Sequence, residues 1–180
     1  YVDYMNKFGN HNVSGMLLWN IDQYDNNAPG NLVASLPRRK MGFAGRLSYD
    51  YDNRYMFEVN AGYNGSENFA KGHKWGFFPS VAVGWNVSQE NFFEPLKDVI
   101  SNLKLRASYG LVGNDQLLDS SGGLIRFIYM SDITLQSENA GFTTGDKQQI
   151  TLNGPVYTRY QNNDLTWEVG EKLNVGFDMQ

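Results

Sequence analysis

Residues 40–64 read KMGFAGRLSYDYDNRYMFEVNAGYN and form two runs in which apolar and polar residues alternate. A period of two is the side-chain repeat of a β-strand, so each run has one apolar and one polar face. The runs meet at Asp52 and Asn53, two residue types that tolerate the positive φ of a two-residue hairpin turn. This stretch predicts a long β-hairpin. Its apolar faces consist of Met41, Phe43, Leu47, Tyr49 and Tyr51, then Tyr55, Phe57, Val59, Ala61 and Tyr63.

The rest of the chain repeats this pattern. Seven strands are expected, at residues 1–8, 13–21, 40–51, 54–64, 77–88, 103–111 and 165–180. Pro79 lies inside the fifth run and predicts a local irregularity or a position where no ladder donor is needed. Residues 89–101 break the alternation and predict a short helix, whose length is limited by Pro95.

The connections between these strands alternate in length. Residues 9–11 and 52–53 form short turns, whereas residues 24–36, 65–76 and 114–164 form long loops. Within the last loop, residues 126–130 and 155–160 are expected to add short strands. Tight turns at one end and long loops at the other are typical of antiparallel, up-and-down transmembrane β-barrels.

Aromatic residues gather near both ends of the predicted apolar face. Trp and Tyr combine an apolar body with a polar tip, and membrane–water interfaces select them for that reason. The expected group at the tight-turn end is Tyr49, Tyr51, Tyr55, Phe57, Trp85 and Phe177, and at the long-loop end Trp19, Tyr63, Phe77, Tyr109 and Trp167. Aromatic residues also favour strands in soluble proteins, so a soluble β-domain stays open at this point.

Composition narrows the classes of function. The chain has 180 residues, no cysteine and a net charge of -4, from 15 basic and 19 acidic residues. These features predict no disulfide framework, no thiolate metal site and no nucleic-acid partner. The sequence starts at Tyr1 without a signal peptide and stops within an alternating run. We therefore expect a segment of a larger barrel: an open sheet of about seven strands with free edges at residues 1–8 and 165–180.

Candidate sites for chemistry are few. We expect His11 and His73 at opposite ends of the barrel, in turn and loop roles, which excludes a shared metal. The sequence has no nucleophile–base set, so we expect no enzyme, no catalytic residue and no cofactor. The Ca²⁺-ligand types Asp22, Asp25, Asn26 and Asn27 are also ordinary turn formers, so no metal site is predicted.

Two polar groups remain as binding candidates. The basic residues Arg38, Arg39 and Lys40 lie where a long loop meets the membrane, and either pair with lipid phosphates or are solvated. The second group faces the barrel interior. It either lines a solute path, or it pairs from strand to strand or packs on a domain inside the barrel. Its members are Arg46, Glu58, Asn60, Lys104, Arg106, Glu168 and Lys172. No substrate-binding residue is assigned.

Four blocks of sequence, in this order, resemble one known family. They read GRLSYDYDNRYMFEVNAGYNGS, GFFPSVAVGWNVSQENFF, LKLRASYGLVGND and DLTWEVGEKLNVGFDM. They resemble the barrel of SusC/RagA-type TonB-linked outer-membrane transporters of Bacteroidota, from about Gly9 to Gln180. The family often has an Arg-Asp-Gly-Ser run after the second central strand, where this chain has Tyr63-Asn64-Gly65-Ser66. That departure puts the loop contacts in doubt and leaves the expected fold intact.

The resemblance implies that residues 1–180 belong to a TonB-dependent receptor-type β-barrel domain, without the N-terminal plug domain that fills the barrel. It implies active uptake of oligosaccharide or peptide fragments across the bacterial outer membrane. The implied partners are a SusD-like surface lipoprotein, the TonB complex through other segments, and membrane lipid. The alternative function is a soluble β-sandwich or barrel module that binds carbohydrate on Trp19, Trp75 and Trp167.

Overall fold

The computed structural model describes residues 1–27, 36–118, 122–147 and 150–180. It divides into two compact units, each described here by itself. The first comprises Tyr1–Ser66, Trp75–Asp115 and Trp167–Gln180, and the second Glu67–Lys74 and Gln116–Thr166. Across the part of the chain that the structure describes, we find no helix with the length and apolar character needed to span a bilayer.

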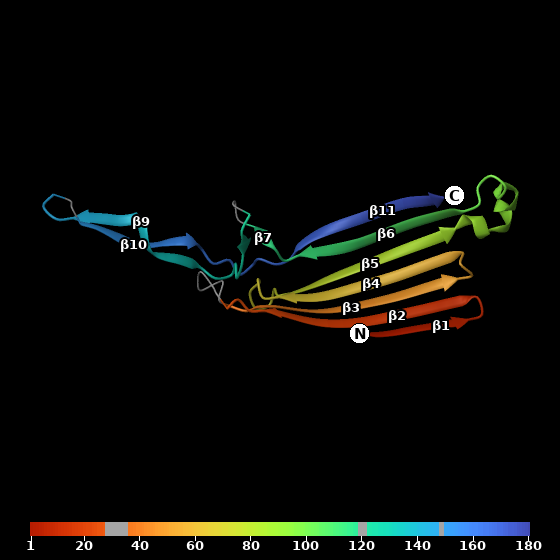
Figure 1. The fold of residues 1–180 in the computed structure, drawn as a ribbon, viewed down its shortest axis with the longest axis horizontal. Helices are drawn as coiled ribbons and strands as arrows, with labels where there is room; N and C mark the ends of the chain where they lie inside the picture. The colour runs from red at the N-terminus through yellow and green to blue at the C-terminus, as the bar shows by residue number, and fades with distance from the viewer. Residues whose placement is uncertain (28–35, 119–121, 148–149) are drawn as a thin grey trace. The chain divides into compact units, whose positions relative to one another are not determined.

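The first unit is a single antiparallel sheet of seven strands (Figure 1). The strands β1 to β5 each pair with the next in sequence, β11 pairs with β6, and the two edges are formed by β1 and β11. This arrangement confirms the predicted up-and-down, transmembrane-barrel-type sheet with two free edges. The strands are β1 (Val2–Phe8), β2 (His11–Tyr24), β3 (Arg38–Tyr51), β4 (Tyr55–Ser66), β5 (Trp75–Asn86), β6 (Leu103–Asn114) and β11 (Glu168–Met179).

The predicted hairpin turn is present between β3 and β4. Asp52 and Asn53 have φ values of 54° and 53°, the positive values predicted for them. The loop between the paired residues Tyr51 and Tyr55 contains three residues, because Arg54 lies in it too, whereas two were predicted. The β3–β4 register runs without a break from Tyr51 opposite Tyr55 to Lys40 opposite Ser66. Gly9, with φ of 61°, makes the corresponding turn between β1 and β2.

One face of the sheet is apolar and uncovered. Leu17, Leu47 and Val83 are 70%, 66% and 50% exposed, and Val175 on β11 is 78% exposed. None of the buried apolar side chains among the described residues lies on the seven strands. A sheet of soluble proteins buries one face against a second layer. The exposed aliphatic band instead matches the lipid-facing surface of a transmembrane barrel.

Aromatic residues border this band, as predicted, and the register arranges them in rows. Trp19, Phe43, Tyr63 and Phe77 lie opposite one another across β2, β3, β4 and β5. At the tight-turn end, Tyr51, Tyr55 and Trp85 form a similar row.

Two residues depart from the predicted aromatic groups. Tyr109 lies opposite Val81 and Leu173, among aliphatic side chains. Trp167 precedes β11, and its ring meets Phe78 edge-on at 5.1 Å between centroids. Phe78 belongs to the parity of β5 that includes Ser80 and Ala82, so Trp167 does not join the apolar face. The alternation of β11 does not extend back to Trp167, because the strand begins only at Glu168.

Pro79 marks a split between β5 and β6. The β5–β6 ladder ends at Ser80 opposite Gly110, whereas β4 still pairs with Pro79. Proline has no backbone N–H to donate, and Pro79 lies just beyond the last residue of β5 that pairs with β6. This position confirms the prediction that no ladder donor is needed there. The Phe78 ring covers Gly113 of β6 so closely that a Cβ at Gly113 would collide with it.

The connector between β5 and β6 is 3₁₀-helical. It consists of η1 (Val87–Gln89) and η2 (Asn91–Leu96), and Pro95 lies within η2. A short helix was expected here, and the structure resolves it into two shorter 3₁₀ pieces. Tight 3₁₀ turns are used in such short runs.

The second unit contains a longer ribbon than predicted. β9 (Asp132–Thr144) pairs with β10 (Ile150–Arg159), and the two-residue strands β7 (Leu117–Leu118) and β8 (Leu124–Ile125) pair with each other. The strand predicted at residues 155–160 lies mostly within β10. The strand predicted at 126–130 is wrong, because these residues form a turn closed by a Met130 N to Phe127 O hydrogen bond of 2.8 Å. Phe127 has φ of 49°, which no strand tolerates.

Candidate functional site: the polar face of the sheet

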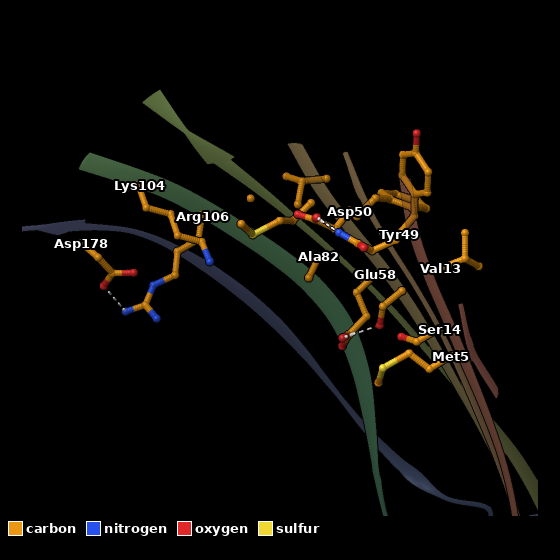
Figure 2. A pocket seen from close by; sticks show the side chains of 16 residues that line it. Met5, Val13, Ser14, Tyr49, Asp50, Glu58, Ala82, Lys104, Arg106 and Asp178 are labelled. Carbon is orange, nitrogen blue, oxygen red and sulfur yellow. Dashed lines mark hydrogen bonds and ion pairs between the residues drawn. The ribbon is translucent and has the colours of Figure 1, made fainter. Parts of the chain in front are cut away.

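The polar face carries a hollow of about 450 Å³ near the tight-turn end (Figure 2). Side chains from β1 to β6 and from β11 line it, because period-two alternation sends one parity of every strand to this face. The charged members of the lining are Asp50, Glu58, Lys104, Arg106 and Asp178. The predicted inward residues Glu58, Lys104 and Arg106 therefore do come together.

Hydrogen bonds cross β3 and β4 at the middle of this face. Glu58 accepts from Ser48 Oγ at 3.0 Å and from Asn60 Nδ2 at 2.8 Å. Arg46 Nε donates to Asn60 Oδ1 at 3.1 Å and lies 3.9 Å from Glu58 Oε1. Ser48 and Glu58 are directly opposite in the register, as are Arg46 and Asn60. The polar residues thus pair from strand to strand, one of the two roles predicted for them.

The same pairing occurs elsewhere on the face. Asn12 Nδ2 donates to Asp50 Oδ1 at 2.7 Å, between β2 and β3. Arg106 Nη2 lies 3.3 Å from Asp178 Oδ1, between β6 and β11, and Figure 2 shows this pair on one side of the hollow. Asn114 Nδ2 donates to Glu168 Oε2 at 3.0 Å. For Lys104 and Lys172, the described residues provide no ion-pair partner within 4.0 Å.

A buried charge pair at the long-loop end was not predicted. Lys40 Nζ donates to Asp115 Oδ1 at 2.8 Å, and Ser66 Oγ donates to Asp115 Oδ2 at 2.8 Å. The Asp115 side chain is only 8% exposed and that of Lys40 31%. Burial opposes ionisation of Asp115, but the hydrogen bonds from Lys40 and Ser66 outweigh it and hold the pKa of this carboxyl below its ordinary value.

This pair gives Lys40, one of the basic residues at 38–40, a partner that the sequence did not predict. Lys40 is engaged by Asp115, and Arg39 Nε donates to Gln23 Oε1 at 3.2 Å. The Lys40 ammonium therefore has a carboxylate partner within the protein. Lys40 and Ser66 are opposite in the register, but Asp115 joins them from beyond β6, and no local pattern in the sequence indicates that contact.

A second cluster lies at the tight-turn end around Glu90. Tyr55 Oη donates to Glu90 Oε1 at 2.6 Å, and Trp85 Nε1 donates to the same oxygen at 3.1 Å. Arg54 Nη1 lies 3.9 Å from Glu90 Oε2. The hydrogen bond from Tyr55, followed by that from Trp85, holds the pKa of the Glu90 carboxyl below its ordinary value.

The residues considered for metal binding show other roles. His11 Nδ1 lies 2.8 Å from Tyr49 Oη, and His73 N donates to Ala70 O in a turn. Asp25 Oδ2 accepts from Gln23 Nε2 at 2.8 Å. Within residues 1–27, 36–118, 122–147 and 150–180, no group of three or more His, Asp or Glu side chains is placed to hold a metal ion.

The three tryptophans of the alternative carbohydrate module do not form one platform. Trp19 stacks on Phe43 and Trp75 stacks on Tyr63, at 6.2 and 4.7 Å between centroids, on the apolar face. Trp167 contacts Phe78 instead, which has the opposite parity. No shared ligand surface follows from this arrangement.

Comparisons with known proteins agree with the architecture. Protein-family models give no match. The chain is 35% identical over 135 residues to TonB-dependent receptor P3 of Formosa agariphila, covering 75% of this chain and 12% of that protein. It is 33% identical over 138 residues to TonB-dependent receptor SusC of Bacteroides thetaiotaomicron, covering 77% of this chain and 13% of SusC. Thus it spans about an eighth of the length of these relatives.

Solved structures show the same fold. The RagAB peptide importer in its open-open state superimposes with a TM-score of 0.68 at 18% identity, over 97% of this chain and 20% of the compared chain. The closed-closed state gives a TM-score of 0.66 at 17% identity. The relatives are named as receptors and importers, not as enzymes. From the sheet topology, the uncovered apolar face and these likenesses, we conclude that the chain belongs to the SusC/RagA family of TonB-dependent receptors and folds as a stretch of their β-barrel wall.

Proposed function

We propose that this chain forms part of the wall of an outer-membrane transporter that takes up oligosaccharide or peptide fragments with energy delivered through TonB. The observation that carries the proposal is the division between the two faces of the sheet. One face exposes aliphatic residues bordered by aromatic rows, and the other pairs its charges across neighbouring strands. A wall between lipid and a polar interior has this division.

The two ends of the sheet give the proposed orientation. In such barrels, short turns are typical of the periplasmic end, and long loops are typical of the extracellular end. The turn at Asp52 and Asn53 and the connector at residues 87–102 would then face the periplasm. The ends of β2, β4 and β6 that lead into the long connections would face the outside of the cell.

Of the relatives named above, RagAB is described as a peptide importer, and its compared chain is much longer than this one. The cargo class is therefore part of the proposal. A direct test compares uptake of a fluorescent oligosaccharide and a fluorescent peptide by cells with and without the intact gene. We expect uptake of one class to be lost with the gene, and also when the proton gradient is collapsed. Unchanged uptake of both classes would refute the proposed function.

We further propose that the ribbon of β9 and β10 helps to form a docking surface for a SusD-like lipoprotein. Its side chains Ile133, Leu135 and Tyr157 are 43%, 73% and 54% exposed, and Tyr157 lies opposite Ile133 in the register. An isolated two-stranded ribbon is only marginally stable in water. Aromatic and aliphatic side chains among polar neighbours suit a protein interface.

The docking proposal can be tested by one deletion and by single substitutions within the ribbon. Deleting residues 116–162 from the intact transporter should leave the barrel folded but weaken co-purification of the lipoprotein or uptake. Leu135→Asp and Tyr157→Asp should weaken capture in the same direction, whereas Asn139→Asp, at an exposed polar position of β9, should not. Normal capture and normal uptake after the deletion would rule the docking role out.

A further inference from the structure

The connector between β5 and β6 is firmly attached to the sheet. Val87, Ser88 and Phe93 are buried, at 7%, 3% and 4% exposure. Ser88 Oγ donates to Asn86 Oδ1 at 2.7 Å, at the start of the connector. At its other end, Ser101 N donates to Gln180 O at 2.8 Å, just after β11. The connector therefore occupies a defined position beyond the ends of β5 and β6 (Figure 1).

Three of the side chains that the connector exposes are large and apolar. Phe92 is 64% exposed, Leu96 50% and Val99 84%, although the adjacent Phe93 is buried. Phe92 and Leu96 lie within η2, and Val99 lies three residues after it. Large apolar side chains that an anchored segment leaves exposed indicate a surface that is covered by something apolar.

Phe92 continues the apolar face of the sheet. The Phe92 ring meets the Trp85 ring edge-on at 6.5 Å between centroids, and Trp85 belongs to the aromatic row of the tight-turn end. Both Trp85 and Tyr55 of this row direct their polar tips to Glu90, two residues before Phe92. Such tips mark the level where a bilayer changes from acyl chains to headgroups.

We propose that Phe92, Leu96 and Val99 insert into the phospholipid leaflet at the tight-turn end, so that the connector lies in the membrane interface as an anchor. In this arrangement, the hydrogen bonds to Glu90 hold the Trp85 indole and the Tyr55 phenol at the level of the lipid headgroups. The three apolar side chains contact the adjacent ends of the acyl chains. Short amphipathic segments bind to this boundary through buried apolar area. The inference rests on the membrane-spanning placement of the proposed function, and adds the connector to the lipid-contacting surface.

Spin labels test this placement in the full-length receptor reconstituted in phospholipid bilayers. Phe92→Cys and Val99→Cys are labelled one at a time on a cysteine-free background, and collisions with oxygen and with a water-soluble nickel chelate are compared. Val83→Cys serves as the lipid-facing reference and Asn53→Cys, in the neighbouring turn, as the water-facing reference. Since Val99 is 84% exposed, its substitution leaves the packing of the connector intact.

We expect a several-fold higher oxygen-to-nickel accessibility ratio at positions 92 and 99 than at 53. Equal ratios at 92, 99 and 53, with a high ratio at 83, would overturn the anchor while sparing the barrel placement. Exclusion of both probes from 92 and 99 would show a protein cover and also overturn it. A low ratio at 83 would refute the membrane placement itself, and the anchor with it.

Discussion

Asp115 shows how one residue can join strands that are distant in sequence. It follows β6 directly, yet its carboxylate accepts from Lys40 of β3 and Ser66 of β4. Breaking a buried pair costs more than the pair contributes, because the remaining charge stays without a partner. The contact therefore specifies the arrangement of the strand ends at the long-loop end of the sheet.

Replacing Asp115 by Asn preserves its shape and removes the charge opposite the Lys40 ammonium. We expect the free energy of unfolding to fall by about 1–3 kcal/mol, the cost of an unsatisfied polar group at a mostly buried site. Denaturant unfolding of the full-length receptor in lipid vesicles measures it. Ser66→Ala removes one hydrogen bond to the same carboxylate and should cost less. A smaller loss for Asp115→Asn than for Ser66→Ala would contradict this account.

The depressed pKa of Asp115 also predicts a pH dependence. The folded chain keeps this carboxyl ionised at pH values where the unfolded chain binds a proton. Its contribution is therefore complete above the ordinary carboxyl pKa of about 4, and is lost as the pH falls through the lower folded-state pKa. The difference in unfolding free energy between the natural chain and Asp115→Asn should be constant near neutral pH and shrink below about pH 4. A difference that grows on acidification would have the wrong sign.

Gly113 supports a second residue-scale prediction, at the split between β5 and β6. A methyl group there would collide with the Phe78 ring, which in turn contacts Trp167. Gly113→Ala should lower the unfolding free energy by about 1–3 kcal/mol, the usual cost of overpacking. Gly170→Ala, on the adjacent strand, is the matched control, because its Cβ would meet no described atom closer than 3.8 Å. Equal effects of the two substitutions would exclude a special role for the Phe78 contact.

At the scale of the element, two consecutive residues of β5 lie on opposite faces of the sheet, one apolar and one polar. Val83 is 50% exposed on the apolar face, whereas Ala82 lies opposite Glu58 on the polar face. Arg on the lipid face at mid-membrane costs about 2–4 kcal/mol. Val83→Arg should therefore reduce the folded fraction of the full-length barrel, seen as loss of heat-modifiable migration on gels. Ala82→Arg should be milder, because its guanidinium would face a carboxylate. Equal losses would refute the assignment of the faces.

At the scale of the whole molecule, the seven strands leave the sheet open. The edges β1 and β11 have unpaired backbone groups, and the apolar face has no cover within the described residues. Barrels of outer-membrane transporters reach about 22 strands. Open edges and a large apolar surface both promote aggregation in water. The 180-residue chain expressed alone should therefore aggregate without detergent, as light scattering and size-exclusion chromatography would show. A monomer with a cooperative thermal transition would favour a soluble β-module instead.

Alternation along the chain was enough to predict the seven strands, their two faces and the turn at Asp52 and Asn53. These features are local, because the period of two within each strand indicates which of its residues lie on each face. The ribbon of β9 and β10 was read as short strands and loops. Its register shifts between Leu152 and Gly154, and again between Gly154 and Val156, so bulges interrupt the period that would have revealed it.

Only the tertiary structure decided which distant residues meet. The pairing of β11 with β6 spans the segment Gln116–Thr166, and it brings Asp178 to Arg106 and Glu168 to Asn114. The sequence alone identified Arg106 and Glu168 as inward and polar, yet left open whether they pair or line a path. Strand register across a long connection is set by the packing and hydrogen bonding of the whole sheet, so no single segment of the sequence specifies it. For the same reason, the partners of Asp115 and Glu90 became visible only in the folded chain.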